Sequence, residues 1–228
     1  SLALGVSALG TAITLAATMG GMTVGSILTA RRLERQPPTS PLLLYGLCEL
    51  AIGLSGLLTQ AGFSVLETLD AATYGAFPAA TAVIHLFGIV LLLGVPTFAM
   101  GATIPILGLV ARRYNLSLAS VYATNTAGAA LGCLLIAFFL IPNLGVYLSI
   151  QVLALVNIGV CLVAFLLQRR ATQHSEIVTG AEGESEAGAS ETQPLRQYDL
   201  WIALVTGFAT FGLEVAWFRS LRAAFQST

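Results

Sequence analysis

Long hydrophobic stretches occupy most of the sequence and predict helices that cross a membrane. A helix needs about 20 mostly apolar residues to span the hydrocarbon core of a bilayer. The stretches are continuous rather than alternating, and lipid leaves no backbone group unpaired, so we expect helices and not barrel strands. The six stretches are Leu2–Ala30, Leu42–Gly62, Ala79–Val110, Ala119–Ile141, Val146–Gln168 and Leu200–Leu221. The sequence therefore predicts an all-α, polytopic transmembrane helix bundle.

The third stretch contains Pro96 and Pro105, each of which removes a backbone donor from a helix. Two separate helices would leave a short second piece, Thr97–Ala111, and would place Arg112 and Arg113 on the wrong side of the membrane. We therefore predict one tilted or kinked helix.

The polar connections between the stretches alternate in charge and predict the orientation. Those at 31–41, 112–118 and 169–199 carry arginines, whereas 63–78 and 143–145 have no basic residue. Basic loops face the cytoplasm in membrane proteins. We therefore expect the three arginine-bearing loops to be cytoplasmic. The first stretch would then begin outside, which implies a further helix before it.

Composition agrees with a membrane protein and excludes several other classes. Of the 228 residues, 56% are hydrophobic and only 9% are charged, and mean hydropathy is +0.85. The net charge of −1 and the absence of a basic patch argue against a nucleic-acid partner. The hydrophobic composition instead predicts the lipid bilayer as the partner. The three cysteines lie in separate apolar stretches, and no catalytic triad, metal site or cofactor site is predicted.

Residues 169–199 differ from the rest of the chain. They are rich in Glu, Gly, Ser and Ala, and they contain too little apolar surface to repay the entropy of ordering. We expect a flexible acidic cytoplasmic linker, which separates helices at 1–168 from one more helix at 200–228.

Small residues at helical spacing predict close helix packing. Helices in lipid associate where small side chains let their backbones approach. The first stretch has Gly21 and Gly25 in a G-x-x-x-G pattern, and the fourth has a four-residue repeat. That repeat consists of Ser120, Thr124, Gly128 and Gly132. Both sets are expected to face other helices.

Several polar residues within the stretches are candidates for an intramembrane site. Glu49 is either a proton- or cation-responsive group or a structural carboxyl bonded to a neighbouring helix. Glu214 and Arg219 lie about 140° apart around a helix, so each should seek a partner elsewhere. The remaining candidates are Trp217, Asn125 and Thr126, the last two lining a polar pocket or bonding between helices.

Five segments resemble the membrane domain of bacterial spermidine-synthase-like fusion proteins. The segments Met19–Arg35, Leu42–Leu54 and Val95–Leu107 carry part of the likeness. The most specific match is Val121–Gly145, which contains a Tyr-Ala-x-Asn-Thr-x-Gly-Ala core from Tyr122 onward. Gly207–Leu221, with its Glu-x-x-Trp-x-Arg pattern, is similar to the helix that opens each half of that domain.

The resemblance implies a bundle similar to the major facilitator superfamily, with two six-helix halves joined by a cytoplasmic loop. This chain would supply the first half without its opening helix, the joining loop, and the first helix of the second half. Family members of the fused type also carry an aminopropyltransferase-like domain, whose cofactor loop and catalytic Asp signature do not occur in these residues.

Three functional hypotheses follow. The chain anchors or serves a polyamine-forming enzyme domain beyond residue 228, transports a small solute using Glu49 and Glu214, or is a structural or assembly subunit. The remaining helices and a possible C-terminal domain of the same protein are the expected partners.

Overall fold

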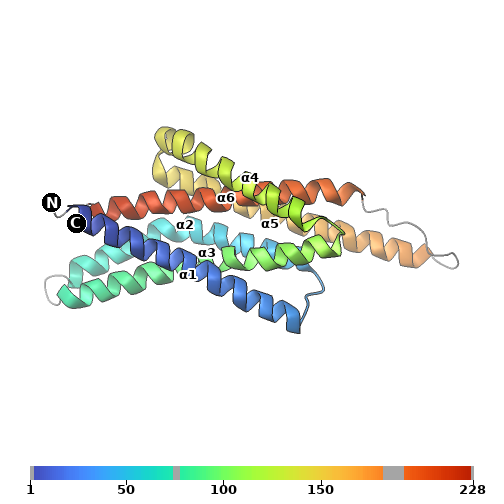
Figure 1. The fold of residues 1–228 in the computed structure, drawn as a ribbon, viewed down its shortest axis with the longest axis horizontal. Coiled ribbons are helices and arrows are strands. Elements are labelled where there is room, and N and C mark those ends of the chain that lie inside the picture. The colour runs from blue at the N-terminus through green and yellow to red at the C-terminus, as the bar shows by residue number, and fades with distance from the viewer. Residues whose placement is uncertain (1–2, 74–77, 182–192, 227–228) are drawn as a thin grey trace.

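The computed structural model describes residues 3–73, 78–181 and 193–226, and all regular structure in these ranges is helical (Figure 1). The elements are α1 Ala3–Arg35, α2 Pro41–Thr73, α3 Pro78–Arg113, α4 Leu118–Leu135, the π-helix η1 Ile136–Leu140, α5 Ile141–Ala181 and α6 Gln193–Gln226. The predicted all-α fold is thereby confirmed.

Four helical segments within the described residues are long and apolar enough to cross a membrane. They are Pro41–Gly62, Val90–Arg113, Leu118–Arg170 and Leu200–Trp217. The third of them has 53 residues and folds back on itself at Gly145 (Figure 1). The chain is therefore a helical protein with membrane-spanning segments, in agreement with the hydrophobic pattern.

Several helices extend beyond the hydrophobic stretches. α2 continues past Gly62 to Thr73, where the hydroxyls of Ser64 and Thr68 donate to carbonyls one turn earlier. α5 reaches Ala181 and α6 begins at Gln193, so part of the predicted linker is helical, and 182–192 lie outside the described residues. Hydrophobicity marks the apolar part of a helix, whereas the helix itself continues as long as its backbone bonds are made.

α3 forms one helix from Pro78 to Arg113 despite its two internal prolines. The Thr97 hydroxyl donates to the Leu93 carbonyl at 2.7 Å, and the Thr103 hydroxyl donates to the Met100 carbonyl at 2.6 Å. Each threonine thus satisfies its hydroxyl within the helix, close to a proline.

The connection from α4 to α5 consists of a π-helical turn followed by a sharp reversal. Pro142 follows the π-helix η1, and the side chain of Asn143 donates to the Phe139 carbonyl at 2.6 Å. Gly145 then has φ 76°, a backbone conformation that L side chains rarely adopt. This glycine lets the chain turn back without a longer loop.

The turn from α3 to α4 is fixed by hydrogen bonds at both helix ends. Asn115 has φ 53° and donates to the Arg112 carbonyl, while the Leu116 amide donates to the Ala111 carbonyl. This pair of bonds is a Schellman motif, with asparagine in the left-handed position. Ser117 then caps α4 by accepting from the Ser120 amide at 3.4 Å.

The arginine-bearing connections lie at one end of the bundle. α1, α3 and α5 run toward that end, and α2, α4 and α6 run away from it (Figure 1). Arg113 donates to the Thr39 carbonyl at 2.7 Å and so joins the first two connections. At the end of the apolar part of α5, the guanidinium of Arg169 lies 4.3 Å from the centre of the Phe165 ring.

Glycines bring two pairs of parallel helices into backbone contact. On α1, Gly25 lies against the backbone of Phe98 in α3. On α4, Gly128 and Gly132 lie against the carbonyls of Leu204 and Phe208 in α6. Ser120, at the start of the same four-residue repeat, is exposed, and Thr124 is half-buried with its hydroxyl bonded within α4.

Replacing Gly128 by alanine tests the α4–α6 contact. The added methyl group would meet the Leu204 backbone, which cannot rotate away, so we expect the free energy of unfolding to fall by about 1–3 kcal/mol. Gly159→Ala is the control, because nothing lies within 4 Å of its added methyl group and alanine favours a helix. Unfolding of both variants in detergent measures the difference, and equal stabilities would contradict the contact.

Candidate functional site

Glu49 lies on α2 at the centre of the helix bundle. Its side chain is 0% exposed, and neither carboxyl oxygen has a hydrogen-bond partner among the described residues. Gly46, one turn earlier, packs against Cys161 of α5, and Gly53, one turn later, packs against Ala154. The carboxyl group is therefore enclosed where α2 and α5 are in close contact.

A hydrogen bond between buried hydroxyls joins α2 to α6 beside Glu49. Tyr45, one turn before Glu49, donates to the hydroxyl oxygen of Thr206 at 2.5 Å. Tyr45 is 1% exposed and Thr206 is 4% exposed. The bond satisfies both groups and fixes α6 at the level of the acid.

Asn157 is a second residue with an unpartnered polar atom at the same interface. Its residue is 0% exposed, and it lies on α5 between Ala154 and Cys161, the two positions that flank Glu49. The side-chain amide donates to the Leu153 carbonyl at 3.2 Å, whereas its oxygen Oδ1 accepts no bond. α5 thus presents an unused acceptor at the level of Glu49.

Thr210, on α6, is a third residue with an unpartnered oxygen. Its hydroxyl is buried and has no partner in the described part of the chain. On α6, Thr206 lies one turn before Thr210 and bonds to Tyr45 of α2, one turn before Glu49. Leu213 lies one turn after Thr210 and packs beside Gly56 of α2, about two turns after Glu49. Thr210 therefore lies level with the acid. We call these five residues the Glu49 site: Tyr45, Glu49, Asn157, Thr206 and Thr210.

The Glu49 site combines one carboxyl group with three hydroxyl groups and one amide, and none of its five residues is cationic. No described arginine forms an ion pair with Glu49, and Cys48 and Cys161 do not combine with it into a group that could hold a metal ion. One carboxyl group among neutral oxygens suits a ligand with a single positive charge. A buried polar group without a partner is unfavourable by several kcal/mol, which makes the Glu49 site a candidate functional site.

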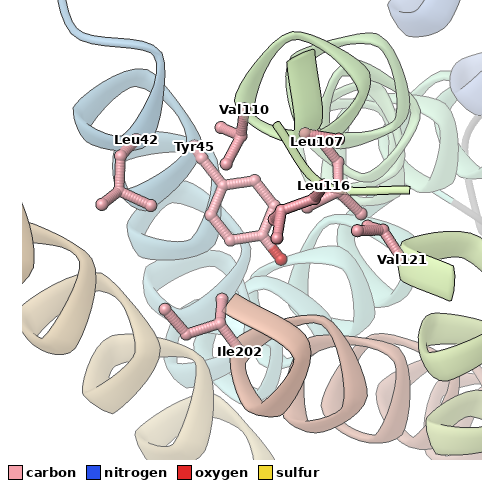
Figure 2. Close-up of a pocket in the computed structure, with 8 residues that line it drawn as sticks. Leu42, Tyr45, Leu107, Val110, Leu116, Val121 and Ile202 are labelled. Atoms are coloured by element: carbon pink, nitrogen blue, oxygen red, sulfur yellow. The ribbon is translucent and has the colours of Figure 1, made fainter. Parts of the chain in front are cut away.

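A small cavity borders Tyr45, and Glu49 is not among the residues that line it. It measures about 10 Å³ and is lined by apolar side chains from several helices, with the Tyr45 ring among them (Figure 2). Its lining is Leu42, Tyr45, Leu107, Val110, Ala111, Leu116, Val121 and Ile202. A water molecule needs two or more polar partners, which this lining does not supply, so we expect the cavity to be dry.

The Glu-x-x-Trp-x-Arg residues of α6 are not brought together. Glu214 is partly buried and lies near Cys133 of α4. Trp217 is 1% exposed, and its indole N–H has no partner among the described residues. Arg219 is exposed. That Glu214 and Arg219 each find a partner on another helix stays a prediction.

Asn125 and Thr126 lie on α4, apart from the Glu49 site. The Thr126 hydroxyl donates to the Tyr122 carbonyl at 2.8 Å within the same helix, and its side chain is exposed. Asn125 is half-buried, and its backbone carbonyl contacts Gly207 of α6. At this position the chain therefore contributes backbone packing to the α4–α6 pair.

Sequence reasoning located Glu49 but missed the other members of its site. Asn157 could have been noticed as a lone amide inside a hydrophobic stretch, and Tyr45 lies one turn from the acid. Thr206 and Thr210 carry no such signal, because threonine is common in membrane helices and usually bonds to its own helix.

Comparison with known proteins yields no match for this chain among protein-family models, curated proteins or solved structures. The chemistry of the Glu49 site and the arrangement of the helices are therefore the basis for a function.

Removing the Tyr45 hydroxyl tests the bond between α2 and α6. Tyr45→Phe leaves Thr206 without its donor, and we expect a loss of about 1 kcal/mol in the free energy of unfolding. Tyr122→Phe is the matched control, because Tyr122 is exposed and its hydroxyl makes only a long hydrogen bond, 3.4 Å, to the Ile104 carbonyl. Unfolding in detergent compares the two, and equal effects would show that the buried bond adds nothing.

Proposed function

We propose that the chain is the membrane-spanning portion of a spermidine-synthase-like integral membrane protein. It would anchor or serve an aminopropyltransferase-like domain that lies outside these residues. The observation that supports this best is the gathering of the arginine-bearing connections at one end of a bundle of apolar helices. Such charge asymmetry fits a protein held in a bilayer with that end in the cytoplasm.

The outward faces of the helices support a lipid environment. Large apolar side chains are among the most exposed in the structure, including Leu91 at 75%, Phe138 at 70% and Phe87 at 69%. In water, molecules with such an apolar surface would aggregate, whereas in lipid this surface is normal for a membrane protein.

The finer topology belongs to the same proposal. The chain would cross the bilayer six times if each of the helices α1 to α6 spans it, with the turn between α4 and α5 at Gly145. The expected setting is the inner membrane of a bacterium, and the bundle would be similar to the major facilitator superfamily. The motif likeness from Tyr122 onward and at Glu214 is the support for this family assignment.

A second candidate function is transport of a small solute, and the burial of Glu49 favours it. An acid without a partner inside a membrane bundle is characteristic of ion and proton pathways. Uptake of labelled spermidine into vesicles, driven by a pH gradient and lost in Glu49→Gln, would favour this candidate over a simple anchor.

Cysteine labelling tests the proposed topology. In a variant whose three cysteines are replaced by alanine, single cysteines are placed at Gln36, beside the arginine-bearing end, and at Leu144, at the opposite end. Both positions are exposed. In intact bacterial cells, a membrane-impermeant maleimide should label Leu144→Cys and should label Gln36→Cys only after the cells are opened.

The reverse pattern would place the arginine-bearing end outside and would contradict the proposal. Labelling of both sites in intact cells would contradict a membrane barrier between the two ends. The control is labelling of both variants after solubilisation, which shows that each thiol is reactive.

A further inference from the structure

The direction of the Tyr45 hydrogen bond bears on the state of Glu49. The Tyr45 hydroxyl is near enough to the Glu49 carboxyl to interact with it, yet it donates to Thr206. A carboxylate is a much stronger acceptor than a neutral hydroxyl, and bonds to it are about twice as strong. An ionised Glu49 would compete with Thr206 for this hydrogen. The bond to Thr206 is compatible with a neutral carboxylic acid, which is a weaker acceptor than a carboxylate.

A neutral Glu49 needs an acceptor for its own O–H, and Asn157 offers one. The Oδ1 atom of Asn157 is buried without a donor, at the level of Glu49 on the facing helix. The orientation of this amide is fixed, because its nitrogen donates to the Leu153 carbonyl. Turning the amide around would place two oxygens against each other.

The surroundings of Glu49 contain no described charge that could stabilise a carboxylate. The titratable groups near it are Tyr45 and Cys48 on α2 and Cys161 on α5. α3 has no titratable residue from 87 to 111, and on α6 Glu214 lies near the thiol of α4 instead. Burying a lone ionised carboxylate here would be very unfavourable.

We propose that the Glu49 site binds a single proton in the closed bundle, and that the protonated Glu49 donates to Asn157 Oδ1 while Tyr45 donates to Thr206. The inference rests on the membrane-embedded bundle proposed above and names the ligand of its interior acid. When the proton passes to water that reaches the site, the carboxylate accepts the Tyr45 hydrogen instead.

The proton thereby controls contacts between three helices. With the proton bound, α2 is joined to α5 through Asn157 and to α6 through Thr206. After its loss, Tyr45 bonds within α2, and both links between helices are broken. Proton release therefore weakens the polar links of α2 to α5 and α6, whereas the backbone contacts at Gly46 and Gly53 do not depend on the proton.

Infrared spectroscopy of the full chain tests the bound proton directly. The protein is measured at pH 7 in a detergent without ester carbonyls, where a protonated carboxyl group gives its own C=O stretching band. We expect this band in the wild type, its loss in Glu49→Gln, and its retention in the control Glu214→Gln. In Asn157→Leu the band should remain but move to higher frequency, because the acid has lost its acceptor.

A further sample keeps the test valid if Glu49→Gln does not fold. Glu214→Gln protein made with carboxyl-¹³C glutamate should show the band shifted to lower frequency by the isotope. Absence of the band at pH 7, or its persistence in Glu49→Gln, would overturn the bound proton. An unshifted band in Asn157→Leu would overturn the assigned acceptor. These outcomes are independent of cysteine labelling, so a failed topology and a failed proton site are distinguishable.

Discussion

Close contact between helix backbones is the constraint on which this structure depends. Between helices in lipid, apolar burial gives little stabilisation, and contact between backbones has to supply most of it. The contact is reciprocal in the α4–α6 pair, where Gly128 lies against Leu204 and Gly207 lies against Asn125. Helices can approach this closely only where their side chains are small. The positions of the small residues therefore limit where larger and polar side chains can lie.

The same constraint produces the Glu49 site. Gly46, Gly53 and Gly56 bring α2 against α5 and α6, and the acid lies between them. Cys48, its neighbour in sequence, contacts both apolar cores of the bundle, so Glu49 lies at their junction. Tight packing that stabilises the bundle therefore also keeps water from the carboxyl group. The buried oxygens of Asn157 and Thr210 lie at the level of the acid, and neither accepts a bond from another described residue in the absence of the proposed proton.

Much of the fold was predictable because it depends on local sequence. Hydrophobic length locates the helices, and charge alternation anticipates the common end of the arginine-bearing connections. The reversal at Gly145 and the preceding π-helix were not anticipated, since they depend on backbone geometry around Pro142 rather than on hydrophobicity. Of the five residues of the Glu49 site, only Glu49 itself was predicted from the sequence. Bringing Asn157 and Thr210 level with Glu49 requires the register between three helices, which no local pattern contains.

Disulfide cross-linking between α2 and α5 tests the central packing most directly. The Cβ of a residue placed at Gly46 would lie 3.2 Å from the Ala164 Cβ, so a shift of a few tenths of an ångström would reach the roughly 3.5–4.5 Å found in disulfides. In membranes, and without the native cysteines, Gly46→Cys combined with Ala164→Cys should therefore cross-link on oxidation. Gly46→Cys combined with Leu155→Cys should not, because Leu155 is 60% exposed on the outer face of α5. Failure of the first pair to cross-link, or equal cross-linking of both pairs, would contradict the enclosed position of Glu49.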